Sequence, residues 1–521
     1  MYPGAYIKKF ADKAAVVMAG SGVVLTYREL EERSKLLARH LYDAGLRRGD
    51  TVALLADNSP TAFEVYWAAK RSGLYITAVN RHLTPDEVAY IVDDSDSRAI
   101  VVSATLQPAA RHLVDVTPEV KVRLSYGGSI EGYQSYEGAL AAASTEPLPS
   151  QPVGGDMLYS SGTTGRPKGI RAPLPDRQVH EPGDTVVGFM GPLYRVGRDS
   201  VYLSPAPIYH AAPLRFCAMV QALGGTVILM EKFDPVAALA AIERYRVTHS
   251  QWVPTMFVRM LKLDEQERTN HDLSSHRVAI HAAAPCPVDV KRAMIDWWGP
   301  IVEEYYSSTE LVGITCITSE DWLLKPGSVG RPALGVARIC SDESGRELPA
   351  GEPGTVYFER EEVPFEYYKN PAKTAEARHP QHPNWWTTGD LGYVDADGFL
   401  FLTDRKAFTI ISGGVNIYPR EIEDALALHP KVLDVAVIGV PDPEMGESVL
   451  AVVQPADGVD GSPAFCDELR GYLGGRIARY KIPRAFDFVD ALPRTPAGKL
   501  VKGLLRDRYA STVVTEGRYD Q

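Results

Sequence analysis

The decisive stretch of the sequence is Tyr159-Ser160-Ser161-Gly162-Thr163-Thr164-Gly165-Arg166-Pro167-Lys168-Gly169. It combines three glycines, four Ser or Thr hydroxyls and two cations, directly after the apolar residues Met157 and Leu158. Glycines let successive backbone N–H groups converge on one point, and hydroxyl and ammonium groups add donors for phosphate oxygens. The stretch therefore predicts a strand that runs into a loop binding a polyphosphate.

This loop differs from the Walker loop of kinases and ATPases. That motif needs four residues between its first glycine and a Gly-Lys pair, which Ser or Thr follows. Here two residues separate Gly162 from Gly165, and Lys168 follows Pro167. The spacing disfavours a P-loop enzyme, although a polar loop without a ligand has a similar composition.

Residues 160–169 resemble the signature loop of the adenylate-forming superfamily, which contains acyl-CoA synthetases, luciferases and nonribosomal peptide adenylation domains. Its members activate a carboxylate with ATP, and most then transfer the acyl group to a thiol. The resemblance covers about residues 25–499 and is closest to acyl-CoA synthetases. It implies that these residues bind the phosphates of ATP: Ser160, Ser161, Gly162, Thr163, Thr164, Gly165 and Lys168.

The composition fits a large protein of more than one domain. The chain has 521 residues, 45% of them hydrophobic and 23% charged, which is more than one hydrophobic core usually serves. Its formal net charge of -11 is spread without a basic run, which argues against nucleic acid or an anionic membrane as the main partner. We expect small-molecule partners and leave the oligomeric state open, with a homodimer as one candidate.

The cysteine pattern predicts neither a disulfide framework nor a zinc site. The five cysteines are odd in number, far apart and without a CxxC pair, which fits a reducing compartment. The first residues lack the apolar region of a signal peptide, and no apolar run approaches the ~18 residues of a membrane helix. We therefore predict a cytoplasmic protein without integral membrane contact.

Helical and strand patterns alternate along most of the chain. Capping-box sequences at 26–29 and 84–87 predict helix starts, and short apolar runs such as 51–56 and 226–230 predict strands. Such βαβ repeats predict parallel sheets flanked by helices, with ligands at the carboxyl ends of the strands. The composition shifts near residues 403–406, so we predict an α/β fold with a large N-terminal ATP- and acyl-binding domain, 1–404, and a small mobile α+β domain, 405–521.

A carboxylate follows one of the predicted strands, in Tyr305-Tyr306-Ser307-Ser308-Thr309-Glu310. Mg²⁺ prefers oxygen ligands, so a carboxylate at this edge of a sheet suits a metal shared with phosphates. The resemblance implies that Tyr306 stacks on adenine, Thr309 touches the α-phosphate and Glu310 ligates Mg²⁺. Ser307 belongs to the same nucleotide site and stands where glycine is commonest.

Two segments resemble the walls of the superfamily's acyl pocket. His281-Ala282-Ala283-Ala284-Pro285 resembles the small-residue turn between adenine and the acyl group, and Pro207-Ile208-Tyr209-His210-Ala211-Ala212 resembles the border of the carboxylate pocket. The nucleotide residues implied here are Ala283, Ala284 and Pro285. The acyl-pocket residues implied are Tyr209, His210, Ala211, His281, Ala282 and Ala283, with His210 also counted as catalytic.

The turn Thr387-Thr388-Gly389-Asp390 fixes a carboxylate after a glycine. In the superfamily this Asp and the Arg that matches Arg405 hold the ribose hydroxyls, so we assign both residues to the nucleotide.

Three features of the C-terminal region complete the resemblance. Lys499 lies in Thr495-Pro496-Ala497-Gly498-Lys499, the context of the superfamily's catalytic lysine, and Ser412-Gly413-Gly414 matches the segment beside the CoA tunnel. In the superfamily the small domain rotates between two half-reactions about a hinge that often carries Lys-Asp. This chain has Ala407-Phe408 there, so we predict Ala407 as the pivot and Phe408 packed against one domain.

The sequence therefore predicts an acyl-CoA synthetase that uses ATP, Mg²⁺ and CoA to activate a small carboxylic acid. The alternatives are a ligase that passes the adenylate to an amine or a carrier-protein thiol, an ATP-binding protein without catalysis, and a kinase or ATPase. A non-catalytic protein would be expected to lack Lys499 or Glu310, and both are present. The alanines at 211, 212 and 282–284 indicate room for a bulky tail or ring, but do not name the acid.

Overall fold

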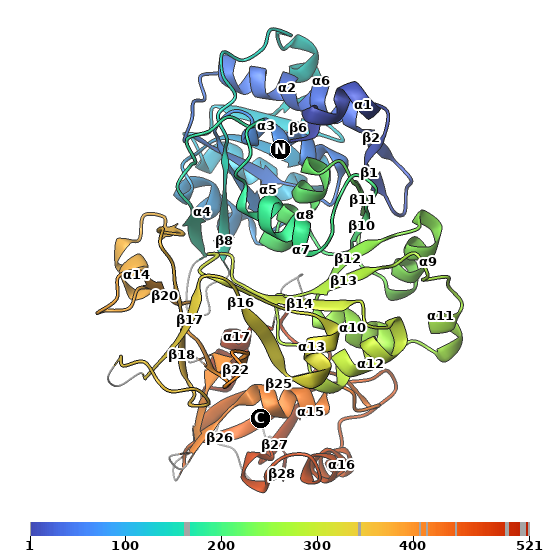
Figure 1. Cartoon of the computed structure of the whole chain (residues 1–521), viewed down its shortest axis with the longest axis vertical. Helices are drawn as coiled ribbons and strands as arrows, with labels where there is room; N and C mark the ends of the chain where they lie inside the picture. The colour runs from blue at the N-terminus through green and yellow to red at the C-terminus, as the bar shows by residue number, and fades with distance from the viewer. Residues whose placement is uncertain are drawn as a thin grey trace.

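The computed structural model shows a long molecule built on three sheets (Figure 1). It describes residues 2–160, 167–341, 345–405, 408–412, 415–442, 445–494, 500–510 and 517–518. Two of the sheets form the N-terminal part, and the third forms a separate C-terminal part at the lower end of the view. This arrangement confirms the predicted mixed α/β fold with a large N-terminal part and a small C-terminal part.

An eight-stranded sheet is formed mainly by the first part of the chain. In sheet order its strands are β19 (Glu366–Tyr367), β9 (Lys168–Arg171), β8 (Gly155–Ser160), β4 (Tyr75–Val79), β3 (Thr51–Leu55), β5 (Ser97–Ser103), β6 (Val122–Tyr126) and β7 (Gln134–Ser135). Its helices are α2 (Tyr27–Asp43), α3 (Pro60–Lys70), α4 (Pro85–Asp94), α5 (Gln107–Val116) and α6 (Tyr136–Ala142). Strands β8 to β7 pair in parallel, whereas β9 pairs antiparallel with both β8 and β19.

Helices cover both faces of this sheet because the side chains of each strand alternate between faces. Along β3, Val52 and Leu54 pack in the cluster that holds α2, α3 and α6, while Ala53 and Leu55 pack in the cluster that holds α4 and α5. Both predicted capping boxes are present at the starts of α2 and α4.

The larger sheet has fourteen strands among the described residues. In sheet order they are β17 (Val336–Cys340), β18 (Gly354–Glu359), β21 (Asp390–Val394), β22 (Leu400–Arg405), β16 (Ser328–Leu334), β15 (Ile314–Ile317), β14 (Val302–Tyr306), β13 (Val278–His281), β12 (His249–Trp252), β10 (Val201–Ser204), β11 (Thr226–Leu229), β1 (Ala14–Met18) and β2 (Val24–Thr26), with β20 (Trp385–Trp386) beside β18. Its helices are α8 (Ala211–Ala222), α9 (Pro235–Tyr245), α10 (Pro254–Leu261), α11 (Glu265–Thr269), α12 (Val288–Trp298), α13 (Ser319–Leu324) and α14 (Pro371–Glu376). Shorter turns are Pro3–Tyr6, α1 (Ile7–Phe10), Ala104–Leu106, a π-turn at Val186–Met190, α7 (Gly191–Leu193) and Arg479–Lys481.

The prediction of parallel sheets is correct for only part of this sheet. Strands β1, β11, β10, β12, β13 and β14 pair in parallel, but the strands from β14 to β17 are antiparallel. Antiparallel neighbours need no crossover helix, so this half of the sheet lacks the βαβ pattern. Helix α8 lies in the core shared with the eight-stranded sheet, while α9, α10 and α12 cover the opposite face of the larger sheet.

The C-terminal part contains a six-stranded sheet with three helices. Its strands are β24 (Val415–Ile417), β23 (Ile410–Ser412), β26 (Gly446–Pro455), β27 (Ala485–Phe488) and β28 (Gly517–Arg518), with β25 (Val432–Asp442) beside β26. Its helices are α15 (Pro419–Leu426), α16 (Pro463–Gly474) and α17 (Lys502–Tyr509). The chain passes from the large sheet to this one between the end of β22 and the start of β23.

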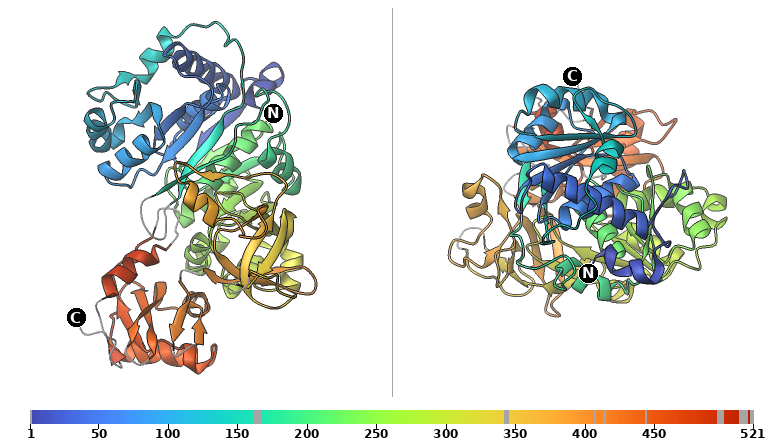
Figure 2. Two further views of the ribbon diagram at one scale, coloured as in Figure 1. Left: turned by 90° about the vertical axis from the view of Figure 1, so that its left-hand side faces the viewer. Right: turned by 90° about the horizontal axis from the view of Figure 1, so that it is seen from above.

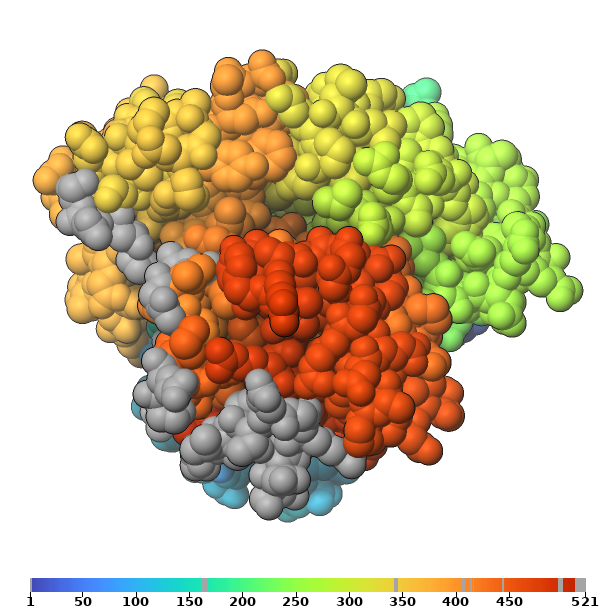
Figure 3. Space-filling model, turned by 90° about the horizontal axis from the view of Figure 1, so that it is seen from below, coloured from blue at the N-terminus to red at the C-terminus, as the bar shows by residue number. Residues whose placement is uncertain are grey.

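Figures 2 and 3 show the C-terminal part lying against the rest of the molecule. The contacts include α15 and the residues after it. Ala427 and Leu428 pack against the hydrophobic cluster beneath the large sheet. Lys262 donates through Nζ to the carbonyl oxygen of Val432, and Arg420 donates through Nη1 to that of Leu402 at 3.0 Å. Among the described helices, none is long and apolar enough to cross a membrane.

Candidate active site

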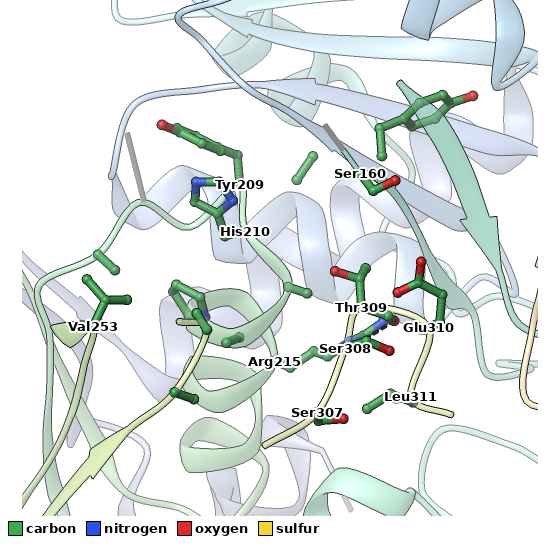
Figure 4. Close-up of a pocket in the computed structure, with 18 of the residues that line it drawn as sticks. Ser160, Tyr209, His210, Arg215, Val253, Ser307, Ser308, Thr309, Glu310 and Leu311 are labelled. Atoms are coloured by element: carbon green, nitrogen blue, oxygen red, sulfur yellow. Dashed lines mark hydrogen bonds between the residues drawn. The ribbon is translucent and has the colours of Figure 1, made fainter. Parts of the chain in front are cut away.

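A cavity of about 460 Å³ lies where the carboxyl ends of strands from both large sheets meet (Figure 4). Residues that directly follow or end β8, β10, β12, β13 and β14 line it, as expected for a ligand site of parallel strands. The predicted site residues that line it are Ser160, Lys168, Tyr209, His210, Ala211, Ala282, Ala283, Ala284, Ser307, Thr309 and Glu310.

The two ends of the predicted phosphate loop are held together. Ser160 at the end of β8 pairs with Lys168 at the start of β9. Tyr159 donates to Asp94 Oδ2 at 2.6 Å, and Tyr90 donates to the carbonyl oxygen of Pro167 at 3.2 Å. The loop residues Ser161, Gly162, Thr163, Thr164 and Gly165 lie outside the described residues.

Glu310 and Lys168 form a charged end of the cavity. Tyr367 donates to Glu310 Oε1 at 2.8 Å, and Lys168 Nζ lies 5.8 Å from the centre of the Tyr367 ring. Burial, and then the like charge of Lys373, lowers the pKa of Lys168. A buried carboxylate beside lysines suits an ion bound together with phosphates.

Sequence reasoning missed Tyr367 and Lys373, which both line this end. They arrive because β19, which lies in the chain between β18 and β20 of the larger sheet, pairs with β9 of the eight-stranded sheet. Lys373 is ion-paired with Glu376 on α14. The Asn-Pro pair at 370–371 signals a helix start, but nothing in the sequence signals this pairing.

Arg215 is a third lining residue that sequence reasoning missed. It comes from α8, one turn after His210, and its Nε donates to Asp156 Oδ2 at 2.9 Å. Its Nη1 lies 3.3 Å from the carbonyl oxygen of Thr309. Arg215 thus connects α8 to β8 and to the loop that carries Thr309 and Glu310.

The segment after β13 agrees with the prediction except at His281 and Pro285. Ala282, Ala283 and Ala284 line the cavity, and Ala283 has a positive φ of 74°. The backbone therefore turns sharply where a small side chain leaves room.

The assignment of His281 to the acyl pocket is wrong. Its side chain is fully buried on the opposite face of β13, with Nε2 3.5 Å from Glu304 Oε2. Side chains alternate along a strand, so when Ile280 and Ala282 face the core beside the cavity, His281 faces away. Burial lowers the pKa of His281 well below its ordinary value. Pro285 does not line the cavity either.

The segment before α8 forms the opposite wall. His210 is the N-cap residue of α8, and its ring lies 4.5 Å from that of Tyr209. Figure 4 shows both side chains across the cavity from Thr309 and Glu310. This distribution separates an apolar end lined by alanines from the charged end.

The two residues predicted to hold the ribose, Asp390 and Arg405, lie opposite each other in the larger sheet. Tyr306 and Thr388 donate to Asp390 Oδ2 at 2.7 and 2.9 Å, and Asp390 pairs with Arg405 across β21 and β22. Thr388 lines the cavity, whereas Tyr306 and Asp390 are not among the residues that line it. The predicted stacking of Tyr306 on adenine stays a prediction.

The predicted residues of the C-terminal part do not reach the cavity within the described chain. Lys499, Ala407, Gly413 and Gly414 lie outside the described residues. Ser412 is buried at the end of β23, where it pairs with Val415 and Gly446.

Phe408 packs against the C-terminal part. Its ring lies 5.5 Å from Lys502 Nζ and 6.0 Å from the Arg506 guanidinium, both on α17. Phe408, the residue after the predicted pivot Ala407, therefore packs on α17, the helix that follows Lys499 in the chain.

The donor set fits Mg²⁺ only as part of a metal–phosphate complex. Among the described residues, no group of three or more His, Cys, Asp or Glu could hold a metal ion. Mg²⁺ commonly binds through one or two carboxylates together with substrate phosphates, and Glu310 supplies one such carboxylate.

Comparisons with known proteins agree with this geometry. A family model described as AMP-binding enzyme matches residues 5–368, and one described as AMP-binding enzyme C-terminal domain matches residues 421–499. The chain is similar to a feruloyl-CoA synthase of Amycolatopsis sp., with 35% identity over 95% of this chain and 96% of that protein. It is also similar to the fatty acid–[acyl-carrier-protein] ligase ScoC of Streptomyces coeruleorubidus, with 32% identity over 94% of this chain and 92% of that protein. The structure of the amide bond synthetase McbA from Marinactinospora thermotolerans matches with a TM-score of 0.80 and 29% identity, covering 98% of this chain and 99% of that one.

Proposed function

The chain belongs to the family of AMP-binding enzymes, and on that premise we propose how it acts as an AMP-forming acid–thiol ligase. A carboxylic acid and ATP give an acyl adenylate and pyrophosphate. CoA then takes the acyl group as a thioester and AMP is released.

One observation carries the proposal, which is that a single cavity joins a charged end to an apolar end. Lys168, Lys373 and Glu310 line the first end, and Ala211, Ala282 and other small residues line the second. A triphosphate suits the charged end and a hydrocarbon body suits the apolar end. Thr309 and His210 also line the cavity, where the carboxylate and the α-phosphate would meet.

The adenylation step is an electrostatic problem. A carboxylate oxygen must bond to the α-phosphorus while the bond from that phosphorus to the leaving pyrophosphate oxygen breaks, and both reactants are anions. Cations held in place offset this repulsion and stabilise the charge that develops in the transition state. Lys168 and Lys373 supply such charge at the pyrophosphate end, and we propose Lys499 as the cation at the carboxylate end.

Mg²⁺ would be held by Glu310 together with the phosphates of ATP. It would supply positive charge for the β- and γ-phosphate oxygens. Tyr367 orients the Glu310 carboxylate by donating to Oε1.

The C-terminal part has the remaining proposed roles. We propose that Ala407 is the pivot of a domain rotation and that Ser412, Gly413 and Gly414 border the path of the CoA thiol. The small separate sheet supports this proposal because the part bearing these residues has its own core.

A second acceptor is supported by the comparisons. One relative is a ligase for a carrier protein and one structural neighbour is an amide bond synthetase. Transfer of the adenylate to a carrier-protein thiol or to an amine is therefore the alternative second half-reaction.

We also propose a reducing, cytoplasmic location. The odd number and wide spacing of the five cysteines support it, because they do not form the pairs of a disulfide framework.

The test of the function is ATP–pyrophosphate exchange over a panel of carboxylic acids, followed by product analysis with CoA, amines and a carrier protein. We expect AMP and pyrophosphate as products, and a thioester with CoA. Formation of ADP with every acid would contradict adenylation, and an amide without a CoA thioester would favour the alternative acceptor.

A further inference from the structure

Arg215 presents a hydrogen-bond donor to the cavity. Its Nε and Nη1 contact Asp156 and the Thr309 carbonyl oxygen, while Nη2 makes no hydrogen bond to a residue that the structure describes. The side chain is 16% exposed and lines the cavity beside Ser308 (Figure 4). A guanidinium carries five N–H donors, so a ligand acceptor can still be bound there.

Tyr305 presents a second donor to the same cavity. Its hydroxyl oxygen accepts a hydrogen bond from Gln251 Nε2 at 3.0 Å, and the hydroxyl proton has no acceptor among the described residues. The ring is fixed by stacking on Phe216, with centroids 5.6 Å apart. Burial raises the pKa of Tyr305, so the hydroxyl keeps its proton and remains a donor.

The charge of Arg215 is already balanced. Burial alone would raise the pKa of Asp156, but the charges of Lys70 and Arg215 hold it below its ordinary value. Asp156 is therefore ionised and pairs with the guanidinium at 2.9 Å. Because Asp156 already balances the charge of Arg215, no second anion is needed beside the guanidinium. An uncharged acceptor is enough for the donors of Arg215 and Tyr305.

We propose that the natural acid carries an uncharged oxygen, as a hydroxyl, ether or keto group, that accepts hydrogen bonds from Arg215 Nη2 and Tyr305 Oη. This inference rests on the proposed function, because it concerns the acid that is adenylated. Phe216 stacks on Tyr305, and the cavity is also lined by apolar residues such as Met190 and Ile314, which favours a hydrocarbon body for the rest of the acid. A plain hydrocarbon acid would leave both donors without water and without a partner, which is unfavourable.

The experiment compares acids that differ only in oxygenation. One pair is 3-phenylpropenoic acid and 3-(4-hydroxy-3-methoxyphenyl)propenoic acid, and a second pair is decanoic acid and 9-oxodecanoic acid. The measurement is kcat/KM for pyrophosphate release with the full chain. We expect the oxygenated member of at least one pair to be preferred by roughly 10- to 100-fold.

Two conservative variants and one matched control assign that preference to the donors. Tyr305→Phe and Arg215→Lys each remove or move one donor while the ring or the charge stays. Tyr202→Phe is the control, because Tyr202 donates to the same Gln251 at 3.4 Å but is fully buried and does not line the cavity. We expect the preference ratio to fall about 3- to 10-fold in both test variants and to stay unchanged in Tyr202→Phe.

Each outcome bears on the proposal separately from the function. A wild-type ratio near one or below in both pairs overturns it, as does an unchanged ratio in both test variants. An equal fall in kcat/KM with every acid in both test variants would mean that Arg215 and Tyr305 only position the Thr309 loop. That result would also overturn the proposal. Absence of pyrophosphate release with all acids would instead contradict the proposed function.

Discussion

Lys373 is the residue whose contribution the sequence least reveals. It lines the charged end together with Lys168, and Glu376 pairs with it. We expect Lys373→Met to raise the KM for ATP about 5- to 10-fold, because a hydrogen bond to a charged group is worth roughly 1.5 kcal/mol. Glu376→Gln should lower this KM about 2- to 3-fold, since Glu376 competes with the phosphates for Lys373.

ATP–pyrophosphate exchange measures both variants. Lys369→Met is the matched control, because Lys369 pairs with Asp96 at 2.7 Å outside the cavity. Equal effects of Lys369→Met and Lys373→Met would show that general surface charge, rather than a phosphate contact, is responsible.

Lys499 is the proposed cation at the carboxylate. We expect Lys499→Ala to lose most adenylation, because one donor at a developing oxyanion is worth roughly 3 to 4 kcal/mol, or about 10² to 10³ in rate. Thioester formation from supplied acyl adenylate should be largely spared. If both half-reactions decline together, Lys499 does not act in the first one alone.

Glu310 is the proposed ligand of Mg²⁺. Glu310→Gln should shift the Mg²⁺ dependence of pyrophosphate release to higher concentration, because an amide is a poorer ligand than a carboxylate. The hydrogen bond from Tyr367 to Oε1 can be kept by the amide oxygen, so the fold should be retained. An identical Mg²⁺ dependence in both proteins would place the metal elsewhere.

Site residues were predictable where one short segment carries them. The stretches at 159–169, 209–212 and 305–310 each contribute several lining residues to the cavity. The prediction for His281 was wrong because the resemblance identifies the segment but not the face of the strand on which each side chain lies. Arg215 and Lys373 were missed because tertiary packing brings them to the cavity from segments without a motif.

Among the elements, the link between β22 and β23 carries the proposed pivot of the domain rotation. Phe408 packs against Lys502 and Arg506 of α17, which supports a pivot before Phe408 in the chain for the proposed rotation. We expect Ala407→Pro, which fixes φ near about −65°, to impair thioester formation far more than adenylation. Separate assays of the two half-reactions measure this difference. Unchanged activity in both would exclude Ala407 as the pivot.

Element positions were predictable where a short apolar run forms a fully buried strand. The strands predicted at 51–56 and 226–230 are β3 (Thr51–Leu55) and β11 (Thr226–Leu229), within one residue at each end. The antiparallel half of the large sheet was not predicted, because its short strands lack intervening helices and give no βαβ signal.

For the whole molecule, buried histidines predict acid sensitivity. Burial lowers the pKa of His249 to about 4, and burial with the charge of His249 lowers that of His276 to about 3. The unfolded chain, with histidine pKa values near about 6.5, binds more protons below that pH. The contribution of these two histidines to folding stability is therefore kept above pH 6.5 and is lost as the pH falls towards 4.

Urea unfolding at pH 7 and pH 5 measures this loss. We expect His249 alone to account for about 2 kcal/mol of it at pH 5. His249→Gln, which can still donate to the Tyr194 carbonyl oxygen, should flatten the pH dependence while being less stable at pH 7. The same pH dependence in both proteins would contradict this assignment.

The overall organisation follows from the sequence better than the site does. The superfamily resemblance inferred from the glycine-rich loop is confirmed by family models that match residues 5–368 and 421–499. Which residues meet across two sheets depends instead on pairings such as β9 with β19, for which a single sequence holds no signal.

The pairing of β9 with β19 also limits how early the eight-stranded sheet can be completed while the chain is being synthesised. Arg171 of β9 and Glu366 of β19 are 195 positions apart, yet they form one ion pair and one rung of the sheet. At roughly 5 to 20 residues per second, a ribosome adds Glu366 about 10 to 40 s after Arg171. The N-terminal sheet therefore keeps one edge unpaired during synthesis, and the nascent chain gains Tyr367 and Lys373, which line the charged end of the cavity, only after most of the protein has been made.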